Sequence, residues 1–273
     1  MNGEMSTTVD ATLETTTTLD AGVETATARP GISLRLMGIA FGICCYVSCA
    51  AFYFFRAGNP VVSFGQARFT ADSLLELSFT ILALPFFGLA YLYGIRHHDE
   101  NPDFVVPDHA IDLLFVAAIV WVAIGNGIHL TAKLDEQMVS VLNDPRGQGI
   151  KTNFHYIRQV IGHVFPHIGW QLLFSALMLG QLRRPYRGEE HKVAVQYCGI
   201  LFGFLFAHGA IAGSCTHIGF ALTAISCLGF SYLWRKSKLL PGEVPILRFF
   251  ISSQVTFLLT VVVYWLVFHS RPI

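Results

Sequence analysis

The sequence predicts an all-α, polytopic integral membrane protein, folded as a seven-transmembrane-helix bundle. Of its 273 residues, 53% are hydrophobic and only 13% are charged, and the mean hydropathy is +0.53. A soluble domain carries about a quarter charged residues. The apolar residues fall into runs of about 20, and a helix of that length crosses the roughly 30 Å hydrocarbon core of a bilayer. The formal net charge is zero, so no overall field favours nucleic acid, and membrane lipids are the expected partners.

Residues 1–31 precede the first apolar run and predict a disordered cytosolic tail. This segment is rich in Thr and Ala and shows no periodicity. It contains five acidic residues and one Arg, unlike an Arg-rich, acid-poor transit peptide, and it lacks the apolar core of a signal peptide. Residues 32–273 are expected to form a single transmembrane domain.

Seven apolar segments are interpreted as membrane spans. The fifth and sixth form an almost continuous apolar stretch, which as one helix would be about 63 Å long, twice what a bilayer needs. The glycines within Gly209–Ser214 allow the tight reversal that divides this stretch into a helical hairpin. The expected spans are residues 33–55, 72–94, 110–131, 157–180, 193–212, 215–234 and 246–268.

Basic residues in the connecting loops predict the orientation. Lys and Arg concentrate in residues 183–192 and again in residues 235–238. Both loops are expected on the cytoplasmic side, which is consistent because two spans separate them. The N-terminus is therefore predicted to be cytoplasmic and the C-terminus outside. Residues 132–156 are expected to form a loop on the outer side.

Histidines inside the expected spans mark the candidate site. Ionisable side chains are costly in hydrocarbon and usually face a protein interior or a water-filled cavity. The alternation of spans places the five histidines near one membrane face, with Asn126 and Glu76 at a similar depth. This grouping predicts one polar site. The five are His129, His163, His167, His208 and His217.

The fourth span carries the strongest local pattern. His or Gln recurs every four residues from His155 to Gln171. His163 and His167 therefore share one face of the helix, about 6 Å apart along its axis. An i, i+4 pair can present two imidazoles to one zinc ion. Pro166, between them, removes one backbone hydrogen bond.

His129 is the next candidate, at the end of the third span. Gly125 and Gly127 flank Asn126, one turn before this histidine. Small residues allow two membrane helices to approach closely. We therefore expect His129 to reach the histidines of the fourth span.

This pattern predicts a zinc-dependent hydrolase that acts on a lipid ester or amide. Three imidazoles can hold zinc and leave a position for water, whose pKa the metal lowers to about 7. The expected ligands are His129, His163 and His167. Glu76 is the expected general base or fourth ligand, and Asn126 is expected to polarise the substrate carbonyl.

Two other functions fit the same residues. Histidines on facing helices could ligate haem b, with His208 and His217 as further cofactor-binding residues. The candidate histidines are all expected at one depth, which favours a single site over a path for electrons across the membrane. Alternatively, a transporter, sensor or assembly protein could use the histidines to handle protons or metal ions. In each case the expected location is a bacterial cytoplasmic membrane.

The remaining polar and aromatic residues of the spans are interpreted as structural. The six cysteines are expected to act as small apolar residues, and no CxxC motif is present. The 23 Phe and 9 Tyr residues are expected to face lipid or form interfacial belts. Ser253 and Gln254 in the last span are expected to hydrogen-bond to neighbouring helices.

Overall fold

A computed structural model describes residues 61–64, 67–70, 84–85, 87–89, 91–139, 145–186, 192–212 and 215–268. This part is almost entirely helical and contains four helices long and apolar enough to cross a membrane. The chain is thus a helical integral membrane protein by length and composition. The tail, the first expected span and most of the second lie outside the described residues, so the count of seven and the orientation of the termini stay predictions. The four helices are Asp108–Glu136, Gln148–Arg183, Thr216–Ser237 and Pro245–Phe268.

A short β-hairpin lies in the expected connection between the first two spans. Strands β1 (Val61–Phe64) and β2 (Ala67–Thr70) pair antiparallel, with Val61 opposite Thr70. The sequence predicted only helices, so this hairpin is a difference from the expected fold. Its strands are rich in the β-branched and aromatic residues that favour extended backbone.

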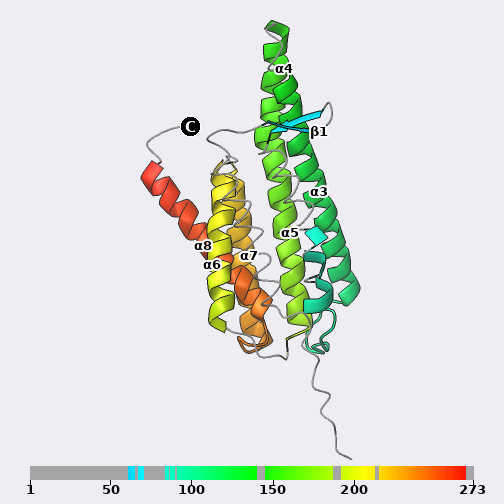
Figure 1. Cartoon of the computed structure of the whole chain (residues 1–273). Helices are drawn as coiled ribbons and strands as arrows, with labels where there is room; N and C mark the ends of the chain where they lie inside the picture. The colour runs from blue at the N-terminus through cyan, green and yellow to red at the C-terminus, as the bar shows by residue number, and fades with distance from the viewer. Residues whose placement is uncertain are drawn as a thin grey trace, which may run out of the picture.

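The third and fourth expected spans are longer than predicted. Helix α3 (Asp108–Val139) has 32 residues, about 48 Å at 1.5 Å per residue. Helix α4 (Pro145–Tyr156), the π-turn η1 (Ile157–Ile161) and helix α5 (Gly162–Arg183) run on without a break. In Figure 1, α4 projects beyond the other helices.

The prediction of a loop over residues 132–156 was therefore wrong. Most of these residues continue α3 or form α4. Charged and polar residues such as Lys, Glu and Gln end a membrane span, but they are good helix formers. Pro145 stands at the first position of α4, where proline starts a helix rather than interrupting one.

The predicted helical hairpin is confirmed. Helix α6 (Lys192–Ala212) is followed by α7 (Thr216–Ser237), and the Cys215 N–H donates to the Ala210 carbonyl across 3.1 Å. Helix α8 (Pro245–Phe268) completes the described bundle. The bounds of these three helices agree with the expected spans to within three residues.

Helix α5 lies between α3 on one side and the group of α6, α7 and α8 on the other (Figure 1). Aromatic rings fill the contact between α5, α6 and α8. Phe174 of α5 stacks on Phe250 of α8 with ring centres 4.5 Å apart, and its edge meets Phe202 of α6 at 5.6 Å. The expectation that aromatic side chains mainly face lipid therefore fails for this cluster, because ring pairs stabilise helix contacts beyond the area they bury.

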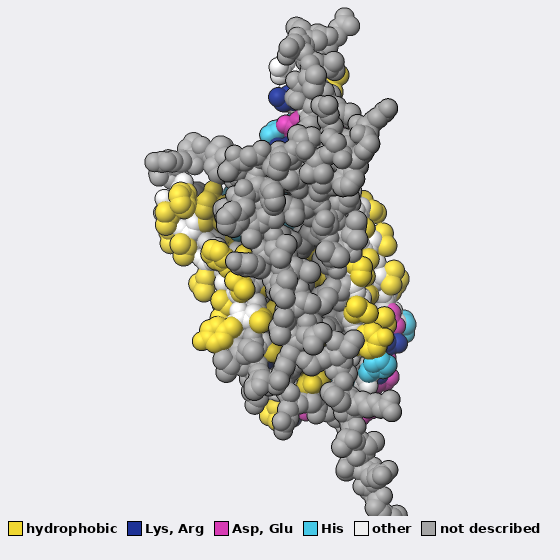
Figure 2. All heavy atoms as spheres, viewed as in Figure 1, with side chains coloured by type: hydrophobic (Ala, Val, Ile, Leu, Met, Phe, Trp, Pro, Cys, Tyr) yellow, Lys and Arg dark blue, Asp and Glu magenta, His cyan; other side chains and the backbone are white. Residues whose placement is uncertain are grey.

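The outer surface of the bundle is apolar. Figure 2 shows hydrophobic side chains along both visible flanks, with charged and histidine side chains gathered towards the two ends. Leu113, Leu228 and Leu266 are among the strongly exposed residues. A soluble protein rarely exposes such extended apolar surface, so these flanks are suited to contact with lipid.

An ion-pair network closes the end of the bundle where α5 finishes. Arg184 binds Glu100 at 2.7 Å and also contacts the carboxylate of Asp108. Arg183 binds Glu100 at 2.6 Å, and Arg96 binds Asp108 at 2.7 Å. The network ties the segment before α3 to the end of α5 and gives this end of the bundle a fixed, charged boundary.

Candidate functional site

His129 and His163 are two predicted site residues that the structure brings together. Their ring centres are 4.5 Å apart and their planes are inclined by 59°. His129 comes from α3 and His163 from the first turn of α5. Both side chains are half-buried. Two helices thus bring together two imidazoles that are 34 positions apart in the sequence.

Glycines allow this approach of α3 and α5. A Cβ at Gly162 would lie 2.9 Å from the His129 Cα, and a Cβ at Gly125 would lie 2.6 Å from Pro166. Either contact is too short for a real side chain, so only glycine fits. The predicted role of Gly125 is confirmed. Gly127 takes no part among the described residues, because a Cβ there would have no atom within 4 Å.

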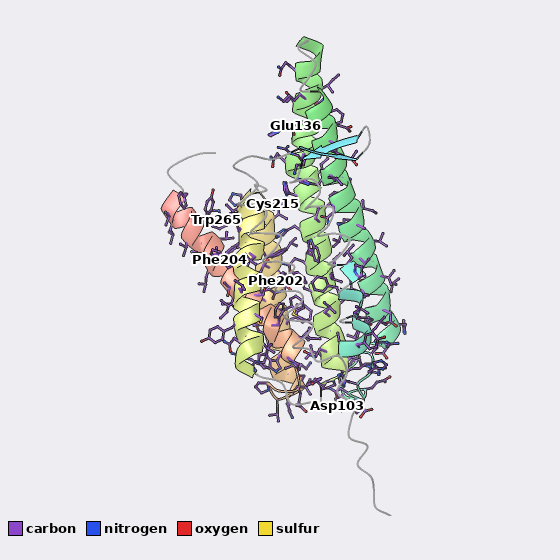
Figure 3. The ribbon with its side chains drawn as sticks, viewed as in Figure 1. Asp103, Glu136, Phe202, Phe204, Cys215 and Trp265 are labelled. Atoms are coloured by element: carbon purple, nitrogen blue, oxygen red, sulfur yellow. The ribbon has the colours of Figure 1, made fainter. Side chains whose placement is uncertain are left out.

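The histidine pair lies near the opposite end of the bundle from the ion-pair network. His163 precedes Arg183 by 20 residues of continuous helix, which is about 30 Å, the thickness of the hydrocarbon core. Just beyond the pair, Arg158 binds Glu136 at 2.7 Å and His155 contacts the same carboxylate at 3.2 Å. Figure 3 shows Glu136 at the end of the bundle opposite Asp103. The pair therefore lies towards the Glu136 end of the bundle, about one hydrocarbon thickness from the ion-pair network.

His167 packs against other helices. Its ring stacks on Phe206 of α6 at 4.5 Å and lies 5.8 Å from Phe257 of α8. Nδ1 is 4.0 Å from the Cys215 sulfur, and a Cβ at Gly219 of α7 would lie 2.6 Å from Nε2. Only 6% of this histidine is exposed. Its neighbours belong to α6, α7 and α8, whereas His163 faces α3.

The four-residue repeat explains this divergence. Each step of four residues turns a side chain by about 40° around the helix. His155 contacts Glu136 of α3 and His163 contacts His129 of α3, but Gln171 donates to the Thr223 hydroxyl of α7 across 2.8 Å. The repeat therefore passes from the α3 side of α5 to its α7 side.

The described residues do not assemble the predicted three-histidine ligand set. Within this part of the chain, no three His, Cys, Asp or Glu side chains are placed to hold one metal ion. His129 and His163 are brought together, and His167 is directed elsewhere. Glu76 lies outside the described residues, so its part in the site stays a prediction.

The other predicted residues are partly placed. His217 is exposed at the start of α7, and its ring stacks on Trp265 of α8 at 5.0 Å. His208 is half-buried near the end of α6. Asn126 lies one turn before His129 on α3 and is also half-buried. Shared cofactor binding by His208 and His217, and carbonyl polarisation by Asn126, stay predictions.

Sequence reasoning missed Cys215 and the glycines that face the histidines. Cys215 was interpreted as apolar packing, although it lies at the hairpin between α6 and α7. Gly162 directly precedes His163 in the sequence, and this adjacency was the available signal for close packing. Searches of known protein families, characterised proteins and solved structures give no match to this chain.

Proposed function

We propose that this chain is a metal-dependent hydrolase embedded in a membrane, and that zinc bound by His129 and His163 acts on a lipid ester or amide. The observation that carries the proposal is the 4.5 Å separation of the two rings across the α3–α5 contact. A bacterial cytoplasmic membrane is the proposed location.

The spacing of the pair suits chelation of one ion. Zinc bonds imidazole nitrogen at 2.0–2.1 Å, so two nitrogens at tetrahedral positions are about 3.3 Å apart. Tilted rings with centres 4.5 Å apart reach that arrangement through small side-chain rotations. Because the rings come from different helices, a bound ion would also cross-link α3 to α5.

A hydrolytic zinc site needs further ligands and an open position. Three protein ligands are usual, and zinc lowers the pKa of its bound water to about 7. We assign the third position, or the general base, to Glu76. His167 is left out of this set because its ring packs against α6, α7 and α8. Asn126 is assigned to the substrate carbonyl.

The depth of the pair indicates the substrate class. About 30 Å of helix separates His163 from Arg183, so the pair lies at the level where lipid headgroups join their acyl chains. Ester and amide bonds of membrane lipids occur at this level. Exposed apolar flanks let such a lipid approach from within the bilayer.

The two alternatives make different demands on the same residues. Haem b between His129 and His163 is disfavoured, because ring centres 4.5 Å apart leave no room for a porphyrin plane. Proton or metal-ion handling without hydrolysis would use the same pair, and it differs from our proposal only in the absence of turnover.

Hydrolysis can be tested with purified protein in lipid nanodiscs. Zinc-loaded protein is incubated with a panel of lipids that carry labelled acyl chains in ester or amide linkage, and released fatty acid is measured. We expect release by the unchanged protein, loss with His163→Ala and retention with His109→Gln, an exposed histidine at the opposite end. Zinc-loaded protein that releases no fatty acid from any lipid in the panel would contradict hydrolase function.

A further inference from the structure

We propose that Cys215 and His167 form a second metal site, selective for a soft monovalent ion such as copper(I). The Cys215 Sγ and the His167 Nδ1 lie 4.0 Å apart, and both residues are buried. The cysteine is at the turn between α6 and α7, and the histidine is on α5. Figure 3 shows Cys215 at the same end of the bundle as Glu136.

The buried imidazole lacks ordinary hydrogen-bond partners. Among the described residues, His167 Nε2 has none, and the only recorded contact of Nδ1 is the distant thiol. The thiol itself lies 3.6 Å from the Ala210 carbonyl. Burying a polar group without a partner costs free energy, and such groups call for an explanation. An ion bound between sulfur and Nδ1 would replace this long thiol contact with two short bonds and hold the imidazole in place, while Nε2 stays against Gly219.

The separation of the two atoms suits an ion that needs few ligands. A metal–sulfur bond is about 2.3 Å long and a metal–imidazole bond about 2.0–2.1 Å. With sulfur and nitrogen 4.0 Å apart, these two bonds meet at the metal at an angle of about 135°. A tetrahedral angle at the metal would need a sulfur–nitrogen separation of about 3.6 Å. No third His, Cys, Asp or Glu of the described residues joins them. Thiolate ligands favour soft ions such as copper(I).

Charge balance also favours a monovalent ion. The site is lined by Phe206, Phe257 and Gly219, which supply no charge. A thiolate and one monovalent cation form a neutral unit, whereas a divalent cation would leave a positive charge in an apolar interior, at high cost. On binding, the Cys215 sulfur exchanges its proton for the ion. The proton passes to water, and no electron is transferred.

Counting bound copper(I) tests the site. The full reduced chain is titrated in detergent without oxygen, against a chromophoric copper(I) chelator. We expect Cys215→Ser and His167→Leu each to bind one ion fewer than the unchanged protein. Cys227→Ser is the matched control, because Cys227 is also buried on α7, and it should lose none. The cysteines of the first expected span are retained throughout, so their copper cancels in the comparison.

Three outcomes would overturn the proposal. These are an unchanged copper count in His167→Leu, an equal loss in Cys227→Ser, or displacement of the ion by equimolar zinc. His167→Leu carries the test if Cys215→Ser fails to fold, and size-exclusion elution reports folding. The zinc content at His129 and His163 should not change in Cys215→Ser or His167→Leu. Zinc and copper(I) binding therefore test the proposed hydrolase site and the proposed copper(I) site separately.

Discussion

Gly162 of α5 lies directly against His129 of α3, with no room for a side chain between them. A Cβ at position 162 would come within 2.9 Å of the His129 Cα, which is backbone and cannot rotate away. The histidine pair therefore depends on close packing of two helices as well as on its own side chains.

Gly162→Ala should loosen this contact and weaken metal binding. Overpacking costs about 1–3 kcal/mol, and the helix preference of Ala returns up to about 1 kcal/mol. We expect a net loss of stability and a lower zinc affinity, measured by thermal unfolding and by competition with a zinc chelator. Gly127→Ala is the control, since its Cβ would meet nothing within 4 Å among the described residues. Equal zinc affinity in both variants would show that zinc binding by the histidine pair does not depend on the close contact between α3 and α5.

Gly203→Ala should destabilise the contact between α6 and α8. A Cβ at this position would lie 2.1 Å from the Ser253 carbonyl oxygen, so the helices must separate. We expect a loss of about 1–3 kcal/mol, read from the unfolding midpoint in detergent. Gly229→Ala, on the exposed side of α7 with open space around it, should be neutral or stabilising. The reverse order of the two variants would show that α6 and α8 do not pack as described.

Arg184→Ala should weaken the end of the bundle opposite the histidines. The Arg184 guanidinium contacts Glu100, Asp108 and the carbonyl of His98. Its side chain is only 15% exposed, and charged hydrogen bonds of this kind contribute about 1.5–3 kcal/mol each. Thermal unfolding should show a clear fall in the midpoint, while the exposed Lys236→Ala should change it little. A fall of equal size in both would assign the effect to general loss of positive charge.

His98 should make stability depend on pH below neutrality. Burial, with a smaller effect from neighbouring His97, holds the pKa of His98 below its ordinary value of 6.5. The unfolded chain therefore binds a proton before the folded chain does, and stability falls as pH drops through 6.5 towards the lowered value. His98→Gln should flatten the change in unfolding midpoint between about pH 7.5 and 5.5 relative to the unchanged protein. An unaltered slope would show that His98 is not the group responsible.

The positions of the apolar helices were predictable because the length of each apolar run indicates a membrane span. The hairpin between α6 and α7 followed from an apolar stretch too long for one helix, and the glycines near Gly209 located the turn to within a few residues. The continuation of helix beyond the apolar runs, at the end of α3 and in α4, was not predictable in this way. Hydropathy marks where a span leaves lipid, and helical hydrogen bonding continues past that point when the sequence favours helix, as it does from Lys133 to Val139.

The sequence predicted that the candidate site residues lie at one level of the bundle, but it did not predict which of them come together as ligands. Alternation of spans brings His129 and His163 to one level, and the structure pairs them. Which neighbour each histidine meets depends on the rotation of α5 between two groups of helices. A spacing of four residues leaves an offset of about 40°, which is enough for His163 to face α3 while His167 faces Phe206 and Cys215. The one-dimensional pattern does not contain that information.

The central claim is that His129 and His163 bind zinc together, and the zinc content of the purified chain tests it most directly. The protein is loaded with zinc, separated from free metal and measured by elemental analysis, alongside His129→Ala, His163→Ala and the control His109→Gln. We predict about one zinc per chain in the unchanged protein and the control, and near-complete loss in both alanine variants with folding retained. Zinc retained in either His129→Ala or His163→Ala, or absent from the folded unchanged protein, would contradict the account.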